Sequence, residues 1–267
     1  MKTIVELKDA TVQVNNGFDE VKTILDHVNL TIYEHDFITI LGGNGAGKST
    51  LFNVIAGTLM LTSGSISILG EDVTHLPAQK RANYLARVFQ DPKMGTAPRM
   101  TVAENLLIAK FRGQKRGFVP RRIHHYQEEF EQLVQKTGNG LEKHLETPTG
   151  LLSGGQRQAL SLLMATLQRP ELLLLDEHTA ALDPGAAEKI LRVTDSIIRE
   201  HNLTCLMITH NMQSALELGN RTIMMDKGKI VTDVSGNERA ALTVNDLLLR
   251  FREISGKALD NDRMLLI

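Results

Sequence analysis

The sequence predicts an α/β fold built on a parallel sheet, and three stretches of the chain predict it. Residues 37–41 form an apolar, strand-like run, which a glycine-rich loop and a helical stretch from about 50 to 61 follow. Strand character returns at 171–176 and 203–209, with a helix expected from about 185 to 200 between them. A strand–helix–strand order of this kind is typical of a parallel sheet that is covered on both faces.

The remaining elements follow from alternation and from helical spacing. Residues 3–14 and 28–41 alternate as strands on either side of a polar loop. From about 100 to 168, apolar residues recur at three- and four-residue spacing, which is typical of helices. A hairpin near 226–229 and a helix at 242–253 end the regular structure.

Composition limits the class of protein. The chain has 267 residues, 42% of them hydrophobic and 23% charged, which suits one sizeable domain or a core with a subdomain. Its net charge of −1 gives no reason to expect a nucleic-acid partner. The one cysteine, Cys205, excludes an internal disulfide, and its apolar neighbours predict a buried structural thiol. No stretch is long enough to cross a bilayer, so we expect a soluble protein whose membrane role comes through a partner.

A glycine-rich loop is the first motif that carries chemistry, because it satisfies the pattern G-x-x-x-x-G-K-[ST]. Small residues let the backbone wrap a phosphate, Lys48 adds a positive charge for the outer phosphates, and the Ser49 hydroxyl can bind Mg²⁺. A chance match has odds of roughly one in a hundred for a chain of this length. We therefore predict a nucleoside-triphosphate site at Gly42, Gly43, Asn44, Gly45, Ala46, Gly47, Lys48, Ser49 and Thr50.

The second motif is Leu-Ser-Gly-Gly-Gln at residues 152–156. Ser153 and Gln156 are spaced as a capping box, which predicts the start of a helix. Two glycines in a first helical turn are unfavourable for helix formation, so capping alone does not explain Gly154 and Gly155. Glycines there would let another molecule approach the exposed N–H groups closely.

The third motif is an apolar strand that ends in two carboxylates. Leu172–Leu175 predict a strand buried on both faces, and ligands of α/β sheets bind at the carboxyl ends of such strands. Asp176 is placed to hold Mg²⁺ by way of water, and Glu177 to orient or deprotonate an attacking water. The alternative is a solvated acidic turn.

These three motifs, in this order, resemble the ATP-binding-cassette (ABC) ATPases over roughly residues 3 to 250. The resemblance implies a P-loop NTPase (RecA-like) core with a parallel sheet and an N-terminal antiparallel β-subdomain. It also implies a helical subdomain inserted at about 93–168, within a single domain over 1–254. Residues 255–267 would then form a loosely held tail.

The same resemblance assigns roles to further residues. Gln90 matches the glutamine loop, which contacts the metal, Asp183 lies in the D-loop at the nucleotide, and His210 matches the switch histidine at the γ-phosphate. Phe18 is the candidate for stacking on adenine, although a hydrophobic turn residue would look the same. His178 stands where the family usually has proline, and it could place a titratable group near the dimer seam.

The resemblance also implies a mechanism and partners. Two copies would associate head to tail around two ATP molecules, each held by the Lys48 loop of one copy and by residues 153–156 of the other. Glu177 would be the general base. The other partners would be integral-membrane permease subunits and, indirectly, a solute-binding protein. The permease-facing surface is expected at about 90–122, with a basic edge toward the membrane formed by the six Lys and Arg residues from Lys110 to Arg122. The alternative for these basic residues is a solvated loop of the helical subdomain.

Three functions are compatible with this pattern. We favour the ATPase subunit of a bacterial importer of amino acids or similar small solutes, located in the cytoplasm on the inner face of the cell membrane. The ATPase subunit of an efflux system uses the same cassette and is the alternative. A soluble ABC protein of translation or DNA repair resembles two cassettes or a cassette split by a long coiled coil, and neither pattern is present in the sequence.

Overall fold

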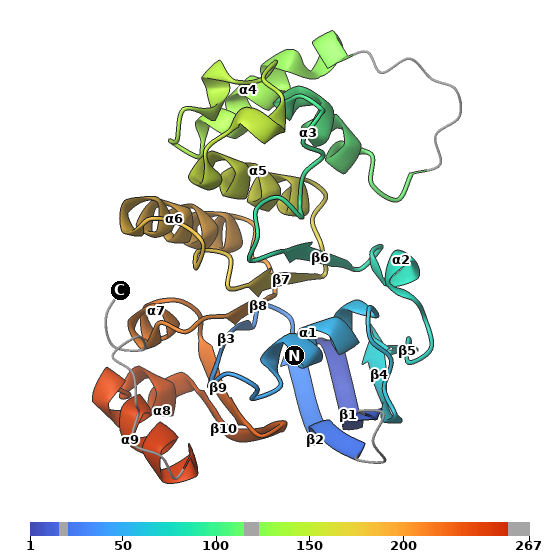
Figure 1. Cartoon of the computed structure of the whole chain (residues 1–267), viewed down its shortest axis with the longest axis vertical. Coiled ribbons are helices and arrows are strands. Elements are labelled where there is room, and N and C mark those ends of the chain that lie inside the picture. Colours follow the sequence, from blue (N-terminus) through green and yellow to red (C-terminus); the bar gives the residue numbers. More distant parts are fainter. Residues whose placement is uncertain (16–20, 115–122, 256–267) are drawn as a thin grey trace. The chain divides into compact units, whose positions relative to one another are not determined.

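The computed structural model describes residues 1–15, 21–114 and 123–255, and it falls into two units (Figure 1). The first unit combines residues 1–85 with the chain from 203 onward, and the second spans 86–202. The elements of the first unit are β1 (Thr3–Asn15), β2 (Val21–Tyr33), β3 (Phe37–Gly42), α1 (Lys48–Ala56), β4 (Ser63–Ile68), β5 (Glu71–Asp72), α2 (Ala78–Arg81), β8 (Cys205–Ile208), α7 (Met212–Glu217), β9 (Arg221–Asp226), β10 (Lys229–Ser235), α8 (Gly236–Ala240) and α9 (Val244–Ser255). Those of the second are β6 (Leu85–Val88), which begins at the boundary, α3 (Val102–Lys110), α4 (Gln127–Gln135), α5 (Gly154–Leu167), β7 (Leu172–Asp176) and α6 (Pro184–Glu200).

The first unit contains the predicted antiparallel and parallel strands. An antiparallel sheet has the strand order β2-β1-β4-β5, and a second group of strands runs β10-β9-β3-β8. β3 is parallel to both of its neighbours, with Ile40 opposite Ile208 on one side and Ile223 on the other. Every residue of β3 is buried, as its apolar sequence predicts. This arrangement confirms the α/β fold with an N-terminal antiparallel sheet.

Helix α1 ends at Ala56, earlier than the end near residue 61 that the sequence indicates. The reason is Gly57, which adopts a left-handed φ of 74° and returns its N–H to the carbonyl of Val54 at 3.2 Å. A left-handed glycine directly after the last turn is a common way to stop a helix. The buried guanidinium of Arg81 also donates to the carbonyls of Val54 and Ile55, at 2.6 and 3.1 Å.

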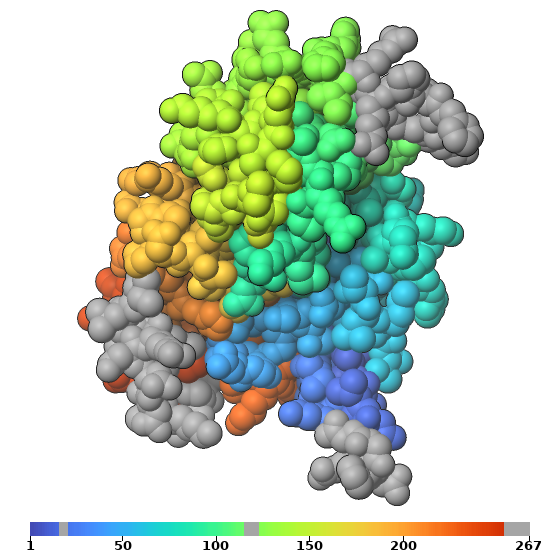
Figure 2. Space-filling model, turned by 45° about the horizontal axis from the view of Figure 1, so that its top comes forward, coloured from blue at the N-terminus to red at the C-terminus, as the bar shows by residue number. Residues whose placement is uncertain are grey.

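The second unit is built round a helical core. Helices α3, α4, α5 and α6 share one apolar cluster, which includes Leu106, Phe130, Leu160 and Ile190. Figure 2 shows the green and yellow-green atoms of α3, α4 and the turns around them as a continuous surface. Strand β7 is the neighbour of β6, and the side chains of Leu172–Leu175 are buried as predicted. The helices inserted between these two strands confirm the predicted helical insertion in the fold.

Within the described ranges, no helix combines the length and the apolar character that crossing a membrane requires.

Candidate nucleotide-binding and hydrolysis site

The glycine-rich loop lies between β3 and α1 in the first unit. Gly47 is the N-cap of α1 with a left-handed φ of 100°, and a Cβ added there would lie 3.0 Å from the carbonyl oxygen of Ile24. A Cβ on Gly42 would lie 2.5 Å from the carbonyl oxygen of Met225. The two outer glycines of the motif are therefore required first by the fold, because at Gly42 and Gly47 a side chain would clash with neighbouring backbone.

The beginning of α1 is suited to an anion. Among the described residues, no side chain caps this helix and no acidic residue lies in its first turn. Unpaired N–H groups at a helix N-terminus attract phosphate. The Lys48 side chain is buried and its Nζ donates to the carbonyls of Gly42 and Gly43, at 2.8 and 3.1 Å. Ser49 is exposed, so its hydroxyl is accessible to a ligand.

The structure brings His210 to the same edge of the sheet as the phosphate loop. Strands β3 and β8 run in the same direction with Ile40 opposite Ile208, so both chains leave the sheet at its carboxyl edge. The N–H of Thr209 donates to the carbonyl of Ile40 at 3.2 Å, which extends this pairing to the residue before His210. The His210 side chain is half-buried.

One aromatic residue was predicted to lie at the nucleotide, and another lies near this loop in the structure. Phe18, predicted to stack on adenine, lies outside the described residues. Phe251 of α9 lies near this loop, because its Cζ is 3.6 Å from the position that a Cβ on Gly43 would take. The sequence did not predict this contact. Its ring belongs to the apolar contacts that join α9 to Leu41 and Met224. The apolar periodicity of α9 indicates a buried face but not which element that face contacts.

The acidic pair ends strand β7 in the second unit. Nη2 of Arg87 lies 2.5 Å from Oδ2 of Asp176, and both side chains are mostly buried. The guanidinium carbon of Arg87 also lies 4.9 Å from the centre of the Phe89 ring. Glu177 is half-buried and has a positive φ of 45°. Sequence reasoning missed Arg87, because nothing in its neighbourhood distinguishes it from a surface cation.

The fit of Mg²⁺ can be judged from the oxygen ligands. Among the described residues, no group of three or more His, Cys, Asp or Glu side chains could hold a metal. Mg²⁺ is commonly held by one or two carboxylates together with phosphate oxygens and water, so it does not need such a group. The Ser49 hydroxyl and the Asp176 carboxylate are each a hard oxygen ligand of the kind that it takes.

His178, next to the acidic pair, does not lie on a surface. Its side chain is 2% exposed, and Nε2 lies 3.0 Å from the hydroxyl of Thr194 in α6. Burial lowers the pKa of His178 to about 4, because the charged imidazolium would lose its hydration. Burial therefore favours the neutral imidazole, and its expected place near a dimer seam stays a prediction.

The second motif forms the predicted capping box. The N–H of Gln156 donates to Oγ of Ser153 at 3.2 Å, and the N–H of Ser153 donates to Oε1 of Gln156 at 3.1 Å. A Cβ on Gly155 would lie 3.2 Å from Cβ of Ala186 in α6, and one on Gly154 would lie 3.3 Å from Cδ2 of Leu182, so the glycines also allow close packing against this turn. Close packing within the unit is a reason for them that the sequence did not indicate.

The other residues assigned by resemblance have the following positions. Asp183 is the N-cap of α6, and its side chain accepts from the N–H of Ala186 at 2.9 Å. Gln90 lies two residues after the end of β6 and is exposed. The side chain of Gln158, in α5, donates to the carbonyl of Phe89 at 3.2 Å, which joins this loop to the helix that the second motif begins.

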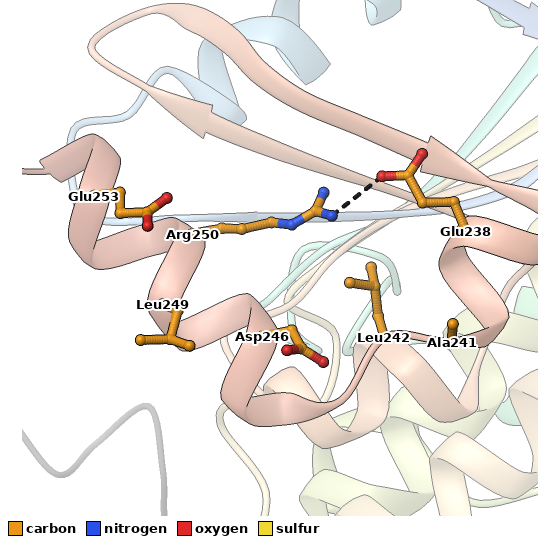
Figure 3. Close-up of a pocket in the computed structure, with 7 residues that line it drawn as sticks. All are labelled: Glu238, Ala241, Leu242, Asp246, Leu249, Arg250 and Glu253. Carbon is orange, nitrogen blue, oxygen red and sulfur yellow. Dashed lines mark hydrogen bonds and ion pairs between the residues drawn. The ribbon is translucent and has the colours of Figure 1, made fainter.

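A hollow of about 390 Å³ between α8 and α9 is a separate feature of the first unit (Figure 3). Its ionisable lining consists of Arg250, which pairs with Glu238 at 3.1 Å, and of the carboxylates of Asp246 and Glu253. Three acids against one base do not suit a polyphosphate. None of the predicted site residues lines it.

A phosphate loop between a parallel strand and an uncapped helix defines a nucleoside-triphosphate-binding α/β protein. The sequence matches the model of the ABC transporter family over residues 25–180. The chain belongs to this family, as a nucleotide-binding ATPase subunit.

Among its relatives is the tyrosine transport ATP-binding protein of Clostridioides difficile (strain R20291). The two are 42% identical over 248 residues, which cover 93% of this chain and 98% of the relative. The spermidine/putrescine import ATP-binding protein PotA of Pasteurella multocida (strain Pm70) is 35% identical over 240 residues, or 89% of this chain. The matched region covers 60% of that longer relative.

Solved structures with a similar fold belong to the same family. An ATP-binding cassette in a dimeric, post-hydrolysis state with ADP and Pi aligns with a TM-score of 0.73 at 28% identity, covering 87% of this chain and 98% of the other. The ADP conformation of an ABC transporter cassette aligns with a TM-score of 0.75 at 25% identity, covering 97% of this chain and all of the other. Both alignments include most of the described chain and agree with the predicted fold.

Proposed function

We propose that the chain hydrolyses ATP to power a bacterial ABC importer of amino acids or similar small solutes. The observation that carries the substrate class is the 42% identity to a tyrosine transport subunit across 98% of that relative. The polyamine import relatives are less similar and longer than this chain. The role of the polyamine relatives in import favours import over the alternative of efflux.

In the proposed reaction, each side chain of the site has a separate role in binding or hydrolysing ATP. Lys48 and the N–H groups at the start of α1 hold the phosphates, and His210, at the same sheet edge, contacts the γ-phosphate. Glu177 takes the proton of the attacking water, and Asp176 and Ser49 hold Mg²⁺. When bound, Mg²⁺ neutralises charge on the phosphate oxygens. Gln90 would sense occupancy of the metal site and Phe18 would stack on the adenine.

We further propose that two copies form a head-to-tail dimer round two ATP molecules. The exposed first turn of α5 supports this, because Ser153 and Gly154 begin a helix whose N-terminus is accessible. A helix end of this kind can bind the γ-phosphate held by the other copy. Asp183 begins α6 close by in the same unit and would border the nucleotide in that dimer.

The proposed permease-facing surface includes two exposed apolar side chains of the second unit. Met94 is 68% exposed and Ile108 52% exposed, and exposed apolar side chains often mark contact with a partner. Lys110 is paired with Glu129 at 2.7 Å, so it does not contribute a free charge to the expected basic edge. Residues 115–122 of that edge lie outside the described ranges.

A cysteine at either apolar position should cross-link to a co-expressed permease. A cysteine at Leu249, an exposed apolar position on α9, is the matched control, and it should remain unlinked. Cross-linking through the cysteine at position 249 alone would contradict the proposed permease-facing surface. The same contact would place the chain on the cytoplasmic face of the membrane, with a solute-binding protein acting through the permease.

The catalytic assignment is tested by Glu177→Gln. This variant should bind ATP as the wild type does but lose at least about a hundredfold in hydrolysis, because the amide cannot take a proton. Glu188→Gln, at an exposed carboxylate on α6, is the control and should hydrolyse normally. Normal turnover by the Glu177 variant would remove this residue from the mechanism.

The substrate class is tested with the chain reconstituted with its permease and solute-binding protein. Uptake of tyrosine or of a similar amino acid, with none of putrescine, is expected. Uptake of putrescine alone would favour the polyamine relatives. ATP-dependent loss of solute from preloaded vesicles would indicate efflux instead.

A further inference from the structure

Glu177 has an unusual backbone conformation for a residue other than glycine. Its φ is 45°, in the left-handed region, which side chains with a Cβ rarely adopt. Such conformations persist when surrounding contacts hold them, and they gather at functional sites. The carbonyl of Glu177 accepts from the N–H of Ala180 at 2.9 Å, which fixes the turn on one side.

His178, the residue after Glu177, supplies a second restraint on this turn. Its imidazole is buried at the end of β7, and its Nε2 lies 3.0 Å from the hydroxyl of Thr194 in α6. That hydroxyl donates its proton to the carbonyl of Ile190 at 2.8 Å. Because the hydroxyl has one proton, Nε2 of His178 must be the donor in the other bond. The contact is thus directional and requires the proton on Nε2.

Thr194 is a firm anchor for this contact. Its side chain is fully buried, and it lies in the middle of α6, a helix that spans residues 184–200. Ile190, one turn earlier, is part of the helical core of the second unit. The imidazole therefore joins the end of β7 to a helix that the core itself holds in place.

We infer that His178 is a positioning residue, which holds the strained turn at Glu177 by donating a hydrogen bond to Thr194. A general base must lie within hydrogen-bond reach of the water that it deprotonates, and displacements of about 1 Å can cost a hundredfold in rate. The inference rests on the proposed function in one respect, which is the role of Glu177 as the base. It adds that the residue next to the base determines where the base lies.

The test uses two pairs of variants in the full-length chain. Thr194→Val removes the hydroxyl at nearly constant volume, and Thr194→Ser retains it. His178→Leu removes the donor, and His178→Gln keeps an N–H donor at the end of a side chain of similar reach. The rate of ATP hydrolysis, the affinity for a non-hydrolysable ATP analogue and the midpoint of thermal unfolding are measured for each.

We expect kcat to fall about tenfold in the valine and leucine variants and to recover in the serine and glutamine variants. ATP affinity should stay within about twofold, because the Lys48 loop is unchanged. The variant with both Thr194→Val and His178→Leu should be no slower than either single change, because the two remove one interaction. Lower unfolding midpoints with an unchanged kcat would make the contact merely structural and overturn the inference. Equal losses in the leucine and glutamine variants would also overturn it.

Comparison with Glu177→Gln separates this inference from the proposed function. If that variant hydrolyses ATP normally, the base is another group and the proposed function fails whatever His178 does. If it is inactive while the valine and leucine variants keep full turnover, the base is correctly assigned and only the positioning role is refuted.

Discussion

Arg81 should be among the most important side chains for the stability of the first unit. It is 1% exposed and donates four hydrogen bonds to main-chain carbonyls, with Nε bonding Leu76 at 2.9 Å and Nη2 bonding Thr74 at 3.2 Å. Nη1 bonds the carbonyls of Val54 and Ile55 in the last turn of α1. The guanidinium thus supplies donors to two carbonyls in the last turn of α1, where intrahelical N–H donors run out.

The expected loss in the free energy of unfolding for Arg81→Met follows from two opposing contributions. Four hydrogen bonds from a charged donor stabilise by roughly 1.5–3 kcal/mol each, or about 6–12 kcal/mol together. Against them stands the cost of burying the charge, which is several kcal/mol and which also lowers the pKa of Arg81. The variant should therefore lose about 3–5 kcal/mol in the free energy of unfolding.

Urea unfolding followed by circular dichroism measures this loss. Arg199→Met is the control, because Arg199 lies on the exposed face of α6 and forms a surface pair with Asp195, one turn away. The control should lose less than about 0.5 kcal/mol. Arg81→Lys should fall between the two, since an ammonium cannot bond four carbonyls in a fork. A loss below about 1 kcal/mol for Arg81→Met would refute the reasoning.

Three further predictions concern the nucleotide site. Arg87→Met should lower the Mg²⁺ concentration for half-maximal ATP hydrolysis by up to about tenfold, because the Asp176 carboxylate is no longer shared with a cation; a raised requirement would contradict this. Subunits with Ser153→Arg and with Lys48→Ala should be inactive alone, but a 1:1 mixture should regain about a quarter of wild-type hydrolysis if sites are shared in a twofold dimer, and no recovery would exclude sharing. Because the pKa of His178 falls from 6.5 unfolded to about 4 folded, the unfolded state binds more protons between these values and stability falls as pH is lowered. Urea unfolding at pH 7 and pH 4 should show wild type losing about 3 kcal/mol more than His178→Gln, whereas equal losses would refute the buried imidazole.

The parts of the fold that were predicted correctly are encoded locally. The apolar run of β3, the glycine loop and the start of α1 adjoin one another, so their order is visible without any tertiary information. The capping box of α5 needs only residues three apart. Strand β2 was predicted to begin at residue 28 but begins at Val21. Register shifts in its pairing with β1 and the left-handed φ of His27 interrupt the alternation that would have revealed it.

The contacts that could not be predicted join residues far apart in the sequence. Arg87 and Asp176 are 89 positions apart, and Arg81 is 27 positions from the helix end that it caps. Short helices such as α7 were also missed, because six residues hold too little periodicity, and α7 depends on the cap that Asn211 provides. The places of the motif residues in the fold were therefore predictable, whereas the side chains that contact them became apparent only in the structure.

The single cysteine has a practical consequence for experiments on this chain. Cys205 is fully buried in β8, and burial raises the pKa of its thiol, so little reactive thiolate exists at neutral pH. Maleimide reagents should therefore leave the folded native chain unlabelled. Reporter cysteines placed on its surface, for fluorescence or for spin labels, can be introduced without first replacing Cys205. The β8 packing next to the phosphate loop then stays native in every labelled sample.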